Sequence, residues 1–187
     1  MNRIICILLV MSICGCGENC SDIYGLKEGS RYEEYMKAAK VYPLCTTSSP
    51  DNEKYRFVWL RSHDNPIVVT MIKDSGKAEV NAIRLDGGSD GKPGEVMETR
   101  MYLISLEEFE RFKLYIDGMD FWNMKPMSRL GEGSAEAGGN DSRWVLEGAT
   151  NKRAHSVDRG SGIYGNFRDA ALFLVDKSGI NINGEAY

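Results

Sequence analysis

The chain has 187 residues, a formal net charge of -4 and a hydrophobic content of 42%. Because its acidic and basic residues are interspersed, the sequence offers no basic stripe, and nucleic acid is not expected as a partner. The length suits one domain with a substantial core.

The N-terminal residues have the pattern of an export signal. Residues 1–3 form a short positive start, and residues 4–13 are an apolar run roughly half as long as a membrane-spanning helix requires. The run ends in Ile13-Cys14-Gly15-Cys16, which resembles the lipobox of bacterial lipoproteins. The resemblance implies a signal peptide of residues 1–15 and lipidation of Cys16. An ordinary secretory signal cleaved nearby is the alternative.

Lipidation of Cys16 would place the protein in the cell envelope. Each buried methylene of an acyl chain contributes about 0.8 kcal/mol, so a multiply acylated cysteine holds a domain on a membrane. Gly17 follows in place of the aspartate that commonly retains lipoproteins in the inner membrane. We therefore expect an outer-membrane position facing the periplasm if the host is Gram-negative.

The cysteine count also fits an exported protein. Of the five cysteines, Cys6 and Cys14 lie in the signal and Cys16 is the lipidation site, which leaves Cys20 and Cys45. An even remainder in an exported chain favours a disulfide. A disulfide that closes the loop between Cys20 and Cys45 would stabilise the fold by about 3 kcal/mol. Free or metal-binding thiols are the alternative.

Residues 16–53 are predicted to be a tether followed by an N-terminal helix. Residues 30–33 match a capping box, and Pro43 should end the helix. The apolar residues at helical spacing are Tyr32, Tyr35, Met36 and Ala39.

Residues 54–179 are predicted to form a single α+β domain, followed by a tail of residues 180–187. Aromatic and β-branched segments separated by turn residues predict an antiparallel β-meander. Amphipathic spacing predicts two covering helices, and a C-terminal hairpin lies between them in the chain. The predicted strands are residues 55–61, 67–72, 78–85, 99–104, 143–147 and 154–159, and the predicted helices are residues 106–118 and 167–177.

Glycine-rich residues 87–92 superficially match three functional loops. The glycine spacing and Pro93 do not fit a phosphate-binding loop, and Met97 stands where a calcium loop needs a bidentate glutamate. Ser89 and Lys92 have the serine hydrolase spacing, but Pro93 and the glycines oppose the helix that this chemistry needs. Since His63 and His155 also match no metal-ligand spacing, we expect no cofactor and no metal.

Part of the body resembles a family of uncharacterised bacterial proteins, several of which carry export signals. The resemblance rests on Phe121-Trp122, residues 144–148, residues 155–159 and the closing amphipathic helix. That family has no assigned activity, so the resemblance implies no function.

The charged hairpin contains the candidate site residues. They are Trp144, Glu147, His155, Asp158 and Arg159. Strand alternation puts His155 and Arg159 on one face and Asp158 on the other. The three tryptophans, Trp59, Trp122 and Trp144, are interpreted as core anchors rather than a sugar-stacking platform.

The sequence favours a non-enzymatic envelope protein that binds another protein, such as an inhibitor or an immunity-type antidote to a toxin. The alternative is a small envelope hydrolase or saccharide-binding lipoprotein built on the charged hairpin. This alternative requires His155, Asp158 and Arg159 to converge with a tryptophan in one pocket. A purely structural envelope component is a third possibility.

Overall fold

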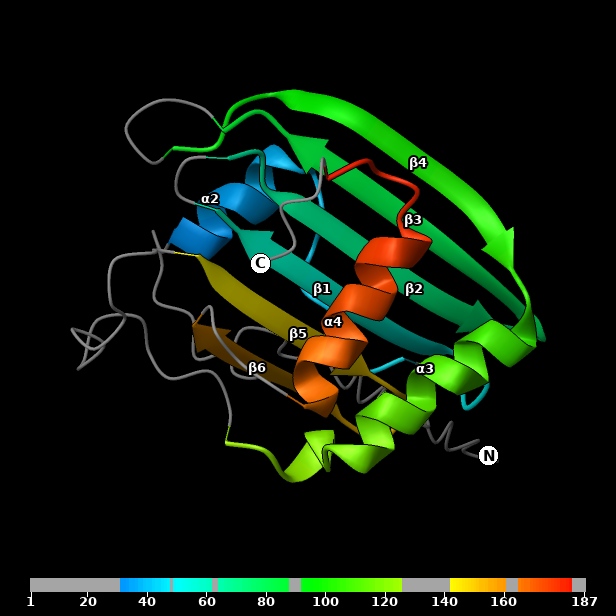
Figure 1. Cartoon of the computed structure of the whole chain (residues 1–187). Coiled ribbons are helices and arrows are strands. Elements are labelled where there is room, and N and C mark those ends of the chain that lie inside the picture. Colours follow the sequence, from blue (N-terminus) through cyan, green and yellow to red (C-terminus); the bar gives the residue numbers. More distant parts are fainter. Residues whose placement is uncertain are drawn as a thin grey trace, which may run out of the picture.

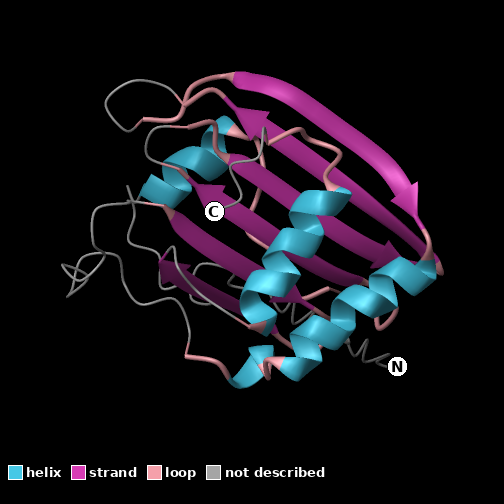
Figure 2. Cartoon of the chain, in the orientation of Figure 1, coloured by secondary structure: helices cyan, strands magenta, loops and turns pink. Residues whose placement is uncertain are grey.

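A six-stranded antiparallel sheet organises the computed structural model, which describes residues 31–47, 49–61, 64–87, 92–125, 142–160 and 165–182 (Figures 1 and 2). The strand order across the sheet is β4-β3-β2-β1-β5-β6. The α+β class and the antiparallel arrangement are confirmed. The strands are β1 (Glu53–Leu60), β2 (Ile67–Asp74), β3 (Lys77–Leu85), β4 (Val96–Ile104), β5 (Arg143–Ala149) and β6 (Ala154–Gly160).

The meander occupies β1 to β4, and its tightest connection joins β2 to β3. Asp74 pairs with Lys77 across a two-residue turn in which Ser75 and Gly76 have φ values of 49° and 77°. Two positive φ values define the turn whose twist suits an antiparallel hairpin. The closing hairpin β5–β6 adds to the sheet beside β1, so β1 becomes an interior strand.

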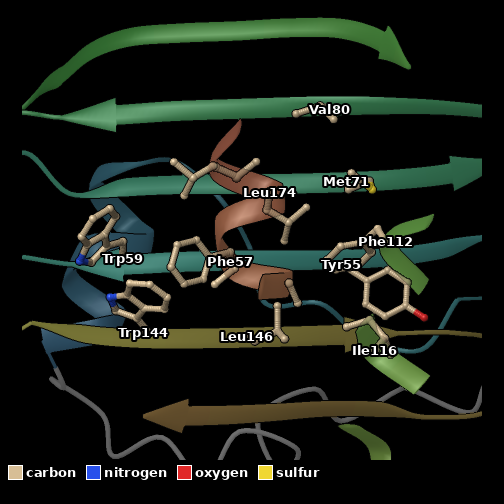
Figure 3. Packing of buried hydrophobic residues seen from close by; sticks show 14 of the residues in the cluster. Tyr55, Phe57, Trp59, Met71, Val80, Phe112, Ile116, Trp144, Leu146 and Leu174 are labelled. Atoms are coloured by element: carbon tan, nitrogen blue, oxygen red, sulfur yellow. The ribbon is translucent and has the colours of Figure 1, made fainter. Parts of the chain in front are cut away.

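Two helices, α3 (Leu106–Gly118) and α4 (Asn166–Lys177), cover one face of the sheet (Figure 1). Their apolar stripes meet alternate residues of the central strands in the main core (Figure 3). The buried helix residues are Phe109, Phe112 and Ile116 of α3 and Phe167, Ala170, Ala171, Leu174 and Val175 of α4. The short 3-10 helix η1 (Phe121–Asn123) follows α3. It approaches β5 so closely that a Cβ atom at Gly148 would lie 2.8 Å from the Phe121 ring.

The opposite face is covered only in part. Helix α2 (Arg31–Ala38) packs there, and Tyr32, Tyr35, Met36 and Ala39 are all buried. They contact a second apolar cluster on the sheet that includes Val58, Leu60, Val68, Leu85 and Val145. The following segment reaches β5, where Leu44 packs on Ala149. Toward β4 the same face is open, and Met97, Met101 and Leu103 are 55%, 72% and 70% exposed.

An ionic contact links the beginning of α3 to the end of α4. Ser105 and Glu108 form a capping box, and the Lys177 ammonium lies 2.9 Å from the Glu108 carboxylate. The Lys177 hydrogen bond, followed by the backbone N–H of Ser105, lowers the pKa of Glu108 to about 2. A group whose folded-state pKa is lowered stabilises the fold above its ordinary pKa and loses this contribution as the pH falls.

We therefore expect Glu108→Gln to flatten the acid limb of the stability profile. Thermal unfolding temperature measured against pH should fall less steeply in this variant than in wild type between about pH 4.5 and about pH 2. Glu107→Gln is the matched control, since Glu107 lies on the same first turn and is exposed. Equal acid slopes in wild type and Glu108→Gln would contradict the assignment.

Candidate functional site

The candidate residues of the charged hairpin do not form one site. The β5–β6 register pairs Trp144 with Arg159 and Gly148 with His155, and all of these lie on the face covered by α3 and α4. Glu147 and Asp158 lie on the opposite face, with α2. The sheet thus separates His155 and Arg159 from Asp158. The pocket required by a hydrolase or saccharide-binding site on this hairpin is not formed.

Each histidine or acid of this group has a structural contact. His155 packs edge-on against Phe121, with 5.1 Å between ring centroids, and its Nε2 lies 3.1 Å from the Met124 carbonyl oxygen. Burial is the main cause that lowers the pKa of His155. Asp158 forms an ion pair with Arg143. Both side chains therefore hold the hairpin in place.

Two of the three tryptophans lie in the core. Trp59 and Trp144 are 3% and 6% exposed, and their rings are 5.4 Å apart in an edge arrangement (Figure 3). Trp122 is partly buried and stacks under the Arg153 guanidinium, 4.2 Å from the ring centroid. The three rings therefore do not line an exposed platform.

A buried polar network that the sequence analysis did not anticipate joins α2 to the sheet. Tyr32 of α2 donates a hydrogen bond to the Glu147 carboxylate on β5. Arg56 on β1 lies 3.2 Å from the other oxygen of Glu147 and donates to Thr70 Oγ1 at 3.1 Å. Arg56 also donates to the Tyr42 carbonyl oxygen at 2.7 Å. One guanidinium therefore fixes two strands and the segment after α2.

Burial dominates the electrostatics of this network. It raises the pKa of Glu147, because removing a carboxylate from water disfavours its charged form. The neighbouring Arg56 charge and the Tyr32 hydroxyl act in the opposite direction. Arg56 and Glu147 form an ion pair in which both side chains are almost fully buried. Removing one partner would leave the other charge buried and uncompensated, which would lower the free energy of unfolding.

A pocket of about 380 Å³ lies beside this network, at the end of α2. Its walls combine apolar side chains and tyrosine rings with three charged side chains. The lining residues are Tyr32, Glu33, Met36, Lys37, Lys40, Val41, Tyr42 and Pro43. Tyr42 is 85% exposed, whereas Met36 is 3% exposed. The pocket therefore has an apolar floor and a polar, exposed rim.

The end of α2 shapes this pocket. Val41 N–H donates to the Met36 carbonyl oxygen and Lys40 N–H donates to that of Lys37, both at 3.0 Å. Lys40 has a φ of 55°. This is the hydrogen-bond pattern of a Schellman motif, in which the left-handed residue is usually glycine. The motif turns the chain sharply, so Val41 and Pro43 face the last turn of the helix across the pocket.

The rim of the pocket is positively charged on one side. Glu33 and Lys37 form an ion pair at 2.7 Å, which largely neutralises both. In the described part of the chain, Lys40 has no ion-pair partner. An apolar pocket beside an ammonium group suits an apolar side chain next to a carboxylate.

Several predicted features lie outside the described residues. They are Cys16, Cys20, His63, Ser89 and most of the glycine-rich residues 87–92. Cys45 lies in the segment that follows α2. Since Cys20 lies outside the described residues, its pairing with Cys45 stays a prediction.

The described residues offer neither a metal-binding cluster nor a membrane-spanning helix. Within these ranges, no group of three or more histidine, cysteine or acidic side chains is placed to hold a metal ion. No helix in the described part is long and apolar enough to cross a membrane.

Comparison with protein-family models, with curated proteins and with solved structures finds no match for this chain. The resemblances to bacterial lipoproteins and to an uncharacterised family therefore stay predictions. The pocket at the end of α2 and the surfaces of the sheet are the features of the chain that bear on its function.

Proposed function

We propose that this chain is a lipid-anchored envelope protein that binds another protein without catalysing a reaction, as an inhibitor or an immunity-type antidote does. The observation that carries the proposal is the pocket at the end of α2, with its apolar floor and exposed rim. Protein interfaces gain most of their affinity where one partner inserts a large side chain into such a pocket.

The rigidity of the pocket supports this proposal. Tyr32 lines the pocket and also donates to buried Glu147, while Arg56 donates to the carbonyl oxygen of Tyr42 on the rim. These contacts fix the pocket before a partner arrives. A preformed pocket binds more tightly because fewer groups lose freedom on association.

The chemistry of the rim specifies the partner. We propose that the partner presents a large apolar side chain for the pocket and a neighbouring carboxylate for Lys40. The carboxylate adds orientation and a faster association rate more than raw affinity.

Lys40→Gly tests this proposal by separating binding from folding. Glycine suits the positive φ at this position, so the variant should be more stable than wild type by about 1 kcal/mol, as measured by urea unfolding. The same variant should recover less of the specific partner in affinity capture from envelope extracts, because the rim charge is lost. Tyr42→Ala, at an exposed rim position, should also weaken capture.

Matched controls lie on the other side of the molecule. Leu114→Ala changes a 70% exposed apolar residue on α3, and Lys77→Gly changes an exposed lysine in the β2–β3 turn region. Neither should alter capture of the partner. Recovery of no specific protein, or of one whose capture is equal in all variants, would reject the proposal.

The proposed lipid anchoring at Cys16 is tested separately. Cys16→Ser is expected to abolish labelling of the chain by palmitate and to release it from the membrane fraction, because the acyl chains supply the anchor. The released protein should unfold at the same temperature as wild type in detergent. Continued labelling of Cys16→Ser would show that another residue is modified.

A further inference from the structure

We infer that the chain forms a symmetric dimer in which the edge strand β4 pairs with β4 of a second copy. The inference is independent of the proposed pocket function. Strand β4 ends the sheet at one side, and no described strand pairs with its outer edge (Figure 1). The unpaired backbone groups of an edge strand are a template for another strand.

The edge of β4 has few of the features that usually prevent such pairing. The strand is nine residues long, it contains neither proline nor lysine, and its register irregularity lies at Arg84/Leu85 near one end. Proteins commonly protect an edge with short strands, charged side chains, proline or a bulge, and of these β4 has Glu98, Arg100 and a bulge near one end. Here, Met97 and Met101 are more than half exposed.

The side chains of β4 are divided between the two faces of the sheet. Ile104 packs against the core under the helices, and Tyr102 lies close to Gly179 after α4. By alternation, Glu98 and Arg100 share that face, while Met97, Thr99 and Met101 lie on the other face.

Symmetry leaves few possible registers. Two copies of one strand pair antiparallel about a two-fold axis perpendicular to the sheet, so each face of one copy continues into the same face of the other. The axis then passes through the position of one residue, which lies opposite its own copy. An axis at Arg100 would place two arginines opposite each other, and an axis at Glu98 would do the same with two glutamates.

An axis at Thr99 makes the strand complementary to itself. Glu98 then lies opposite Arg100 of the second copy, twice by symmetry. Met97 lies opposite Met101 of the second copy. Opposite charges and apolar pairs directly across an antiparallel ladder both stabilise it. This charge complementarity identifies a second copy of the chain as the occupant of the edge.

The ionic contacts within one chain are compatible with this arrangement. Glu98 already lies 2.7 Å from Arg100 and 2.9 Å from Arg84 on its own sheet. Arg100 is the more exposed member of its pair, so it can turn across the axis toward the second Glu98 without leaving Glu98 of its own chain unpaired.

Charge exchange at the edge tests the dimer and its register together. The mass of the full chain in detergent micelles is measured by light scattering for wild type, Glu98→Arg and Arg100→Glu. Wild type should be a dimer, and each variant should dimerise about tenfold more weakly or worse, because like charges face each other twice. An equal mixture of the two variants should dimerise as wild type does, since every facing pair is again of opposite charge.

The mixture makes the test independent of folding defects. A variant that simply fails to fold would not be rescued by the other, and Glu34→Arg, at an exposed position on α2, controls for the change in net charge. A monomeric wild type across the micromolar range would overturn the inference. So would a mixture that dimerises no better than its components.

Cysteine cross-linking tests the position of the axis. Thr99→Cys should be joined to its own copy by a short bismaleimide reagent, because the two side chains face each other. Met101→Cys is the matched control on the same face, and its two copies would lie about four residues, or about 13 Å, apart along the ladder. Cross-linking of Met101→Cys but not of Thr99→Cys would overturn the register.

Discussion

Arg56→Met is expected to lower the free energy of unfolding by about 3–5 kcal/mol at neutral pH, as measured by urea denaturation. The substitution keeps most of the volume of the side chain but removes the charge beside buried Glu147, which lies 3.2 Å away. It also removes the donors to Thr70 and to the Tyr42 carbonyl oxygen. Glu147 would be left with Tyr32 as its remaining polar contact among those described here.

The loss of unfolding free energy in Arg56→Met should depend on pH. Because burial raises the pKa of Glu147, the folded protein binds the proton of this carboxyl more tightly than the unfolded chain does. Such a group favours folding below its unfolded pKa, and this advantage is lost as the pH rises. Arg56 lowers this pKa, so its removal raises the pKa of Glu147 further, and the deficit of Arg56→Met should be smaller at pH 4, where the carboxyl is more protonated, than at pH 7.

The double variant Arg56→Met/Glu147→Leu is the decisive control. Replacing a buried ion pair with apolar residues of similar volume is often neutral or stabilising, whereas removing one partner is costly. We expect the double variant to be more stable than Arg56→Met alone. A double variant that shows the summed cost of both single changes would mean that the two side chains do not act as a pair.

Trp144→Ala is expected to cost about 3–5 kcal/mol of unfolding free energy, because it leaves a cavity in the main core. The Trp144 ring packs edge-on against Phe57 and Trp59, at centroid separations of 5.3 Å and 5.4 Å. At temperatures where Trp144→Ala remains folded, its near-ultraviolet circular dichroism signal should be weaker than that of wild type.

Trp144→Phe separates the contribution of ring packing from that of the indole N–H. The indole N–H of Trp144 is buried and has no hydrogen-bond partner among the described residues, so its removal should cost little. The loss of unfolding free energy should be smaller than that of Trp144→Ala, because most of the ring volume is kept and the cavity is smaller. If Trp144→Ala kept full stability, the ring would not be a core anchor, and binding of saccharides to it would need to be measured.

The fold class followed from local sequence signals because each element has its own periodicity. Capping residues Ser105 and Glu108 located the beginning of α3, and alternation located the strands. The sequence did not place β5 beside β1, since the partner of a strand depends on contacts between distant residues. It also underestimated β4, which begins at Val96, because its exposed residues do not alternate in polarity.

The site was harder to predict than the fold. Glu147 was singled out for chemistry, yet its partners are Arg56 and Tyr32, which lie far away in the chain. One signal was present: Arg56 stands between Tyr55 and Phe57 in a strand whose neighbours are apolar. A charged side chain in the middle of an interior strand needs a partner of opposite charge. Sequence alone does not show which acid supplies it.

The position of β1 has a consequence for how the chain reaches its native state. During synthesis from the N-terminus, β1 to β4 emerge before β5, and β1 pairs on its second side only when β5 has followed. Until then, a strand rich in aromatic residues has an open edge, which is prone to aggregation. Addition of the closing hairpin is therefore the last step of sheet assembly, and the partly formed sheet is most prone to aggregation in the interval before the hairpin arrives.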